Sequence, residues 1–247
     1  MRHKEYTREV EGSSLSVLFI HGIAGTPDHF TDFIPLVPDN ISVRNILLDG
    51  HGKGVKDFSH TSMKKWRAQV EREVDDLLSR YGKIIIVAHS MGTLFSIRQA
   101  VSRPDRIKGL FLLASPLKLF IKPAMFVNSA KLFINKKDDN DRELASIRRA
   151  YGIENDMRFW RYIGWVPRYL ELFAEIKAVR GLVSSLSVPT RVYQSGKDEM
   201  VSVSSMKLLA DNPYIEASVL KNSGHCYYDQ SDLEALLSDF SSFLTED

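Results

Sequence analysis

Short runs rich in β-branched residues alternate with longer segments of helical periodicity along most of this chain of 247 residues. The run from Ile84 to Val87 is continuously apolar, which is typical of a central strand buried on both faces. Strands that alternate with helices form a mostly parallel sheet flanked by helices. The sequence therefore predicts an α/β fold, with strands at residues 16–20, 41–48, 83–88, 107–113, 190–194 and 215–220.

Three segments carry the clearest helical signals. Ser62 is a favoured N-cap residue, and apolar side chains follow it at three- and four-residue steps until Gly82 ends the pattern. A second helix is expected over residues 90–102, where Pro104 follows its end, and a third over residues 231–244.

The regular alternation stops between residues 116 and 181. This stretch contains no convincing strand, two of the three tryptophans, and helical-looking segments at residues 144–151 and 169–179. We therefore expect an inserted helical subdomain over residues 116–181 and a core formed by residues 1–115 and 182–247. The charged run at residues 136–143 is expected to be a solvated turn or a helix start.

Composition excludes several classes of function. The formal net charge is only +2, which disfavours binding to a nucleic-acid backbone. Cys226 is the only cysteine, so an intramolecular disulfide framework and a cysteine-clustered metal site are both excluded. The first apolar run, Val17 to Ile20, is too short for a signal sequence or a membrane span. We expect a cytoplasmic protein without stable membrane insertion.

Ser90 lies at the point where the buried strand gives way to a helix, in the pentapeptide Ala-His-Ser-Met-Gly at residues 88–92. At such a turn the serine hydroxyl projects clear of the sheet, and small residues are needed two positions to either side. Gly92 meets this requirement, and Ala88, which stands where glycine is usual, is still small. The alternative role for Ser90 is that of an ordinary helix N-cap.

A serine hydroxyl becomes a nucleophile only if a base takes its proton and a third group orients that base. His225 follows the last expected strand, and Asp198 follows the strand before it. Both positions fall at the edge where open parallel sheets bind ligands. The sequence therefore predicts Ser90, His225 and Asp198 as the catalytic residues. The rivals for the role of the acid are Glu199, Asp211 and Asp229.

Acyl transfer also requires hydrogen-bond donors for the oxyanion that forms when the serine attacks a carbonyl. Met91 follows Ser90 directly, so its N–H lies at the helix N-terminus. The second expected donor is the N–H of Ile23, in the glycine-rich stretch at residues 21–25 that follows the first long strand. The order of these segments along the chain supports this catalytic arrangement more strongly than any one segment does.

Cofactor and metal sites find little support in the sequence. The glycine-rich residues 50–54 lack the spacer and the Lys-Ser/Thr pair of a phosphate-binding loop. His21, His51 and His60 lie on separate segments without the spacing of a metal site. We expect neither a cofactor nor a metal. Cys226 is expected to be a buried structural thiol, with a redox-sensitive role as the alternative.

In the chain order serine, acid, histidine, these motifs resemble the α/β-hydrolase fold over essentially the whole chain. Within that fold the sequence resembles the small bacterial carboxylesterase and monoacylglycerol lipase-like group, as judged also from residues 48–52, 197–201 and 223–225. The resemblance implies a cap made from the insertion. It also implies the catalytic and oxyanion-hole roles given above to Ser90, Asp198, His225, Ile23 and Met91.

The expected activity is hydrolysis of a small-molecule ester with a short to medium acyl chain, through an acyl-enzyme intermediate. Aromatic side chains of the insertion are candidates to shelter the acyl chain, namely Phe120, Phe126, Phe133, Trp160 and Trp165. The alternatives are a thioesterase or a carbon–carbon bond hydrolase with the same triad, and a ligand-binding receptor with little turnover. The sequence leaves the oligomeric state open.

Overall fold

The computed structural model describes residues 3–119 and 142–246. Seven strands form the main sheet in the order β1-β3-β2-β5-β6-β8-β9, and all neighbours pair in parallel except β1 and β3. The predicted α/β fold with a mostly parallel sheet is therefore confirmed. The strands are β1 (Tyr6–Arg8), β2 (Leu15–Ile20), β3 (Ser42–Ile46), β5 (Lys83–His89), β6 (Ile107–Leu113), β8 (Thr190–Ser195) and β9 (Ile215–Leu220).

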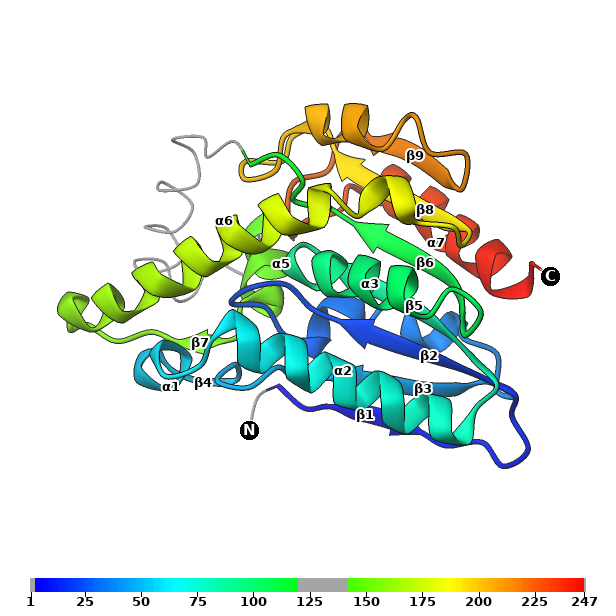
Figure 1. The fold of residues 1–247 in the computed structure, drawn as a ribbon. Helices are drawn as coiled ribbons and strands as arrows, with labels where there is room; N and C mark the ends of the chain where they lie inside the picture. Colours follow the sequence, from blue (N-terminus) through cyan, green and yellow to red (C-terminus); the bar gives the residue numbers. More distant parts are fainter. Residues whose placement is uncertain (1–2, 120–141, 247) are drawn as a thin grey trace.

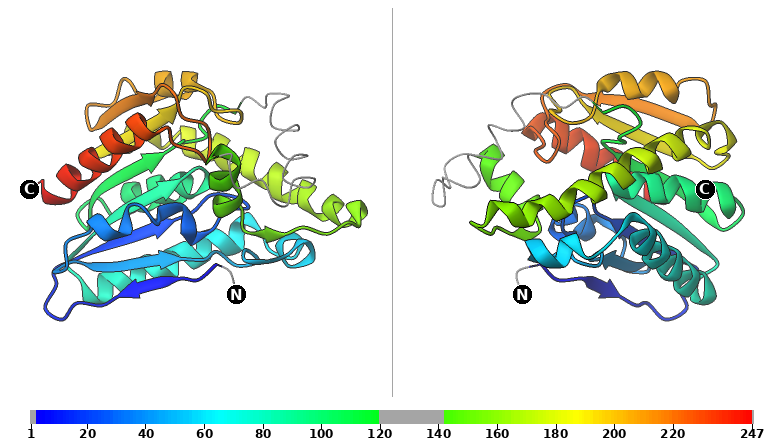
Figure 2. Two further views of the ribbon diagram at one scale, coloured as in Figure 1. Left: turned by 180° about the vertical axis from the view of Figure 1, so that it is seen from behind. Right: turned by 60° about the vertical axis from the view of Figure 1, so that its left-hand side comes forward.

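Helices cover both faces of this sheet (Figures 1 and 2). One face carries α2 (Met63–Arg80) and α3 (Met91–Ser102), and the other carries α7 (Gln230–Thr245) with the short 3-10 helices η1 (Pro27–Phe30) and η2 (Ile34–Leu36). Ser62 caps α2 as predicted, because its hydroxyl accepts a hydrogen bond of 3.2 Å from the N–H of Lys65.

Two separate hydrophobic cores follow from the alternation of side chains along each strand. In β2, Leu18 and Ile20 face the α2 and α3 side, whereas Val17 and Phe19 face the α7 side. All four are fully buried. Burial of apolar surface on both faces is what the continuous apolar runs predicted, and it places the polar residues that follow each strand at one edge of the sheet.

The described part of residues 116–181 is mainly helical. It contains α5 (Arg142–Ala150), η3 (Phe159–Trp165) and α6 (Val166–Arg180), close to the two predicted helical segments. A two-residue strand, β7 (Ile153–Glu154), also occurs there and pairs with β4 (Lys53–Gly54), so the expectation of no strand was wrong. Most of the charged run at residues 136–143 lies outside the described residues, and the division into core and cap stays a prediction.

Helix α6 is not separate from the main core. Leu172 and Ile176 belong to the same buried cluster as Trp66 of α2, and Glu175 forms an ion pair with Arg98 of α3. The parallel strands point toward the side of the molecule where β7 and the first turns of α6 lie (Figure 1). The insertion is thereby brought against the carboxyl edge of the sheet. Among the described residues, no helix is long and apolar enough to cross a membrane.

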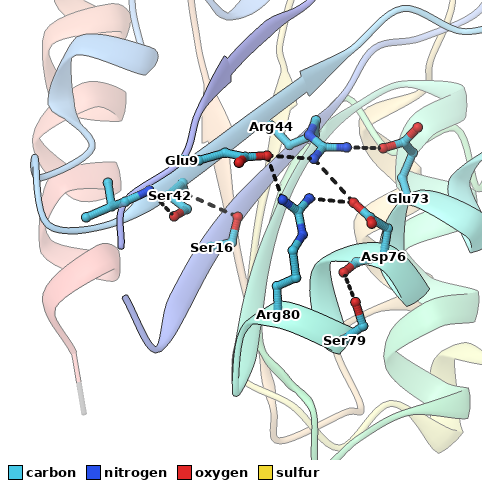
Figure 3. Close-up of polar contacts among 9 residues, drawn as sticks. Glu9, Ser16, Ser42, Arg44, Glu73, Asp76, Ser79 and Arg80 are labelled. Atoms are coloured by element: carbon cyan, nitrogen blue, oxygen red, sulfur yellow. Dashed lines mark hydrogen bonds and ion pairs between the residues drawn. The ribbon is translucent and has the colours of Figure 1, made fainter. Parts of the chain in front are cut away.

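The β1 end of the sheet is held by charged side chains (Figure 3). Arg44 of β3 contacts Glu73 at 2.7 Å and Asp76 at 3.3 Å on α2, and Arg80 joins Asp76 to Glu9. Isolated surface ion pairs contribute little, but a shared network with a mostly buried arginine holds its members in place at lower entropic cost. This network fastens α2 to the edge of the sheet.

Candidate functional site

Ser90 stands between the last residue of β5 and the first residue of α3. Its backbone has φ 50° and ψ −121°, a conformation that costs a serine roughly 1–3 kcal/mol. Among the described residues its side chain caps no helix N–H, so the alternative role as an ordinary N-cap is wrong. A Cβ at Gly92 would lie 2.3 Å from the carbonyl oxygen of Ile20, which explains why glycine is required there.

Ser90, His225 and Asp198 lie in one hydrogen-bonded row. The distance from Ser90 Oγ to His225 Nε2 is 3.1 Å, and that from His225 Nδ1 to Asp198 Oδ2 is 2.8 Å. All three residues are buried. The other carboxylate oxygen of Asp198 accepts hydrogen bonds from the N–H groups of Met200 and Val201, at 2.7 and 2.8 Å, so the carboxylate cannot rotate away from the imidazole.

The electrostatics of the row favour a negative Asp198 and a basic His225. Burial alone would lower the pKa of His225, but the carboxylates of Asp198 and Glu199 outweigh burial and raise it above its ordinary value. Burial alone would raise the pKa of Asp198, but the charge and hydrogen bond of His225, together with two backbone N–H groups, lower it. Asp198 is therefore ionised at neutral pH.

The rival acids occupy other places. Glu199 reaches the backbone N–H of His225, at 3.3 Å, rather than its ring. Asp229 caps α7 by accepting a hydrogen bond from the N–H of Ser231, and Asp211 is exposed. The structure thus brings Asp198, and none of these three, to the Nδ1 atom of the imidazole.

The glycine-rich loop at residues 21–25 lies directly over the serine. A Cβ on Gly22 would be 2.9 Å from the Cβ of Ser90, and Ala24 has a left-handed φ of 53°. The N–H of Gly25 turns back to the carbonyl of Gly22, at 3.0 Å. Among the described residues, the N–H of Ile23 donates no hydrogen bond. The N–H of Met91 lies in the first turn of α3, where the helix itself provides no acceptor.

Two buried histidines hold this loop, which is a role that the sequence did not reveal. His51 Nε2 accepts a hydrogen bond of 3.1 Å from the N–H of Ala24, and His21 Nε2 accepts one of 3.0 Å from the N–H of Leu48. Burial lowers the pKa of His51 to about 4, so the ring is a neutral acceptor. His60 follows helix α1 (Val55–Ser59) and is exposed, so it is not part of this pair of buried histidines.

A cavity of about 180 Å³ opens beside the row of Ser90, His225 and Asp198. Its apolar wall includes Ile23 of the loop, Ile147 and Tyr151 at the end of α5, and Tyr169 of α6. Trp160 and Trp165 do not line it; Trp165 is buried against Phe58, and Trp160 is half exposed. The aromatic wall therefore consists of tyrosines rather than the predicted tryptophans. Phe120, Phe126 and Phe133 lie outside the described residues.

Solved structures share this fold at low sequence identity. One reported with LipS and LipT, two metagenome-derived lipolytic enzymes, has a TM-score of 0.75 at 20% identity and covers 98% of this chain and 97% of its own. The monoacylglycerol lipase of Paleococcus ferrophilus has a TM-score of 0.68 at 18% identity, with 99% of each chain covered. At such identities the likeness concerns the fold.

Sequence comparisons give the family. A probable lysophospholipase of Arabidopsis thaliana, BODYGUARD 2, is 30% identical over 120 residues, which are 45% of this chain and 26% of that protein. The chain matches about a quarter of the length of each such curated relative. The pattern of the alpha/beta hydrolase family, however, matches residues 17–238, which is most of the chain. With the parallel sheet and the serine turn after β5, this match establishes that the chain belongs to the alpha/beta hydrolase family.

Proposed function

We propose that this chain is a serine carboxylic ester hydrolase, of the carboxylesterase and monoacylglycerol lipase-like kind, acting on short to medium acyl esters. The observation that carries the proposal is the buried row of Ser90, His225 and Asp198, with hydrogen bonds of 3.1 and 2.8 Å. Such a row supplies a nucleophile, a base and a group that orients the base.

In the proposed reaction Ser90 Oγ attacks the ester carbonyl while His225 Nε2 takes the hydroxyl proton. The N–H groups of Ile23 and Met91 stabilise the oxyanion, and His225 then gives the proton to the departing alcohol. Water attacks the acyl-enzyme in the same way and releases the carboxylic acid. Asp198 accepts the Nδ1–H bond throughout, which fixes the ring and stabilises the imidazolium.

The cavity supports a substrate of modest size. Its volume of about 180 Å³ is below the roughly 300–1,000 Å³ of clefts that enclose drug-sized ligands. Its wall of Ile23, Ile147 and Tyr169 is apolar, which suits an acyl chain. We also propose that residues 116–181 are a cap over the core, because Ile147, Tyr151 and Tyr169 come from this segment.

The proposal is tested by replacing Ser90 with Ala. Hydrolysis of p-nitrophenyl butyrate should fall at least about 10⁴-fold, and covalent labelling by a fluorophosphonate should be lost. Ser96→Ala is the matched control, since Ser96 is buried in α3 and, among the described residues, its hydroxyl bonds only the carbonyl of Gly92. Turnover retained by Ser90→Ala, with both variants folded by circular dichroism, would refute the assignment.

A substrate series then separates the related activities. Rates on p-nitrophenyl esters from acetate to laurate should peak at a short or medium chain, and should exceed the rates on acyl-CoA and on a 1,3-diketone. Faster turnover of acyl-CoA would indicate a thioesterase, and faster turnover of the diketone would indicate a carbon–carbon bond hydrolase. Stoichiometric labelling of Ser90 without turnover of any of these compounds would indicate a receptor.

A further inference from the structure

We propose that His89, His225 and Cys226 form a binding site for Zn²⁺, and that occupation of this site stops hydrolysis. Each residue offers one ligand atom, and the three atoms lie within 4.8 Å of one another. The two histidines are buried, and Cys226 is partly buried beside them. No step of the proposed hydrolysis uses the Nδ1 atom of His89 or the thiol of Cys226.

The free ligand atom of His89 follows from its hydrogen bond. His89 Nε2 lies 2.9 Å from the backbone carbonyl oxygen of His225, and a carbonyl oxygen can only accept. Nε2 therefore carries the proton in the neutral ring, and the lone pair is on Nδ1. A Cβ built on Gly22 would lie 3.2 Å from this Nδ1, so the lone pair is on the side of the loop that covers Ser90.

His225 and Cys226, the second and third ligands, line the same cavity as His89. The ring centroids of His89 and His225 are 4.8 Å apart, and both rings line the cavity with Cys226. Zinc binds imidazole nitrogen at about 2.0–2.1 Å and thiolate sulfur at about 2.3 Å, which puts tetrahedral ligand atoms roughly 3.5 Å apart. Because the ligand atoms lie within 4.8 Å of one another, the side chains must approach by about an ångström for the set to close around the ion, with water in the fourth position.

The surrounding charge favours a cation. The carboxylate of Asp198 is 2.8 Å from His225, and that of Glu199 is 3.3 Å from the N–H of the same residue. A divalent ion at the three ligands would be attracted by both carboxylates, which offsets the cost of removing it from water. When the ion binds, the thiol of Cys226 gives its proton to solvent and coordinates as the thiolate.

Inhibition follows from the atom of His225 that the ion would use. Its Nδ1 is bonded to Asp198, so the ion must take the Nε2 lone pair, which otherwise receives the proton of Ser90. Zinc and proton transfer therefore exclude each other. This second half of the inference rests on the proposed function, whereas metal binding itself does not.

The activity test uses tag-free protein and p-nitrophenyl butyrate. Zn²⁺ should inhibit with a stoichiometry of one, EDTA should restore the rate, and Mg²⁺ should have no effect because it prefers oxygen ligands. Cys226→Ser should raise the Zn²⁺ concentration for half-inhibition at least about tenfold, with each rate expressed relative to the same variant without metal. His60→Gln, which removes an exposed histidine elsewhere, is the control and should behave like the wild type.

A binding measurement separates metal binding from inhibition of hydrolysis. Co²⁺ should produce a thiolate charge-transfer band in the wild type and in Ser90→Ala, but not in Cys226→Ser. In calorimetry His89→Gln, whose amide can still donate to the carbonyl of His225, should bind Zn²⁺ at least about tenfold more weakly. Equal inhibition of Cys226→Ser and wild type, or no cobalt band, would overturn the site. A band without inhibition would uphold the site and contradict the role of His225 as the base.

Discussion

The backbone of Ser90 is strained, and its neighbours show how the strain is held. Its N–H donates to the carbonyl of Leu113, at 2.8 Å, and its own carbonyl accepts the hydroxyl of Thr93, at 2.7 Å. Both bonds are buried, where a lost partner costs about 1–3 kcal/mol. The serine is therefore fixed before substrate arrives, and binding energy is not needed to orient it.

At this scale we predict that Asp198→Asn lowers kcat about 10⁴-fold, as in other triads. The amide would present no charge to the imidazolium and would favour the wrong tautomer of His225. Glu199→Gln should cost less than about tenfold, because Glu199 accepts a hydrogen bond from the backbone N–H of His225 and none from its ring. Rates with p-nitrophenyl butyrate measure both variants, and a larger loss for Glu199→Gln would mean that Glu199 is the acid.

The three residues of the row were predictable from the sequence because each follows an apolar run that local rules identify. The loop histidines were not. His51 bonds the N–H of Ala24 across 27 residues of chain, and no local pattern indicates that a histidine will serve a distant backbone group.

At the scale of elements, the loop over Ser90 depends on the insertion. Gly152, between α5 and β7, donates its N–H to the carbonyl of Ala24 at 2.8 Å and accepts from the N–H of Gly52 at 2.6 Å. The predicted oxyanion donor Ile23 is the residue before Ala24. The position of the insertion and the position of this donor are thus set by the same hydrogen bonds.

We predict that Gly152→Ala lowers kcat about 10- to 100-fold and changes KM less. The added Cβ would lie 2.3 Å from the carbonyl oxygen of Gly25, so the loop must move, and misplacement of a catalytic group by about an ångström can cost 10² in rate. Gly181→Ala is the matched control, since its Cβ would make an ordinary contact at 3.6 Å.

Steady-state kinetics and thermal unfolding of the two glycine variants decide the point. An unchanged kcat for Gly152→Ala, or a loss explained by a fraction of unfolded protein, would show that the contact is only structural. We do not expect any residue other than glycine at position 152 to restore kcat.

The strands that the sequence does not predict are short. Strand β7 has two residues and β1 has three, so neither has a periodicity to recognise. They form because a neighbouring strand supplies their partners, as β4 does for Ile153 and Glu154. The long strands and helices were predictable because their own side chains are buried at regular intervals.

For the whole molecule, we predict a loss of stability in mild acid. Burial lowers the pKa values of four histidines, to about 4 for His51 and about 3 for His89, and well below the ordinary value for His21 and His29. The unfolded chain, with histidine pKa values near 6.5, binds more protons below that pH. Stability is therefore full above about pH 6.5 and declines as the pH falls toward 4.

The free energy of unfolding, from urea titrations, should fall by at least about 2 kcal/mol between pH 7.5 and pH 5. The raised pKa of His225 acts in the opposite direction, because its contribution to stability is lost as the pH rises. It is a single histidine, whereas four histidines have lowered pKa values. His51→Gln should flatten the dependence, and the exposed His60→Gln should not. A free energy that stays constant over this range would contradict the prediction.

The network around Arg44 also bears on how copies of the molecule meet. An open sheet offers backbone N–H and C=O groups at its margins, to which another chain can add a strand. One of the two margins is β1, a three-residue antiparallel strand whose Arg8 already donates to the carbonyls of Val37, Pro38 and Ile41. An approaching strand would find only a short row of free groups beside a cluster of charges. This end of the sheet therefore resists edge-to-edge aggregation.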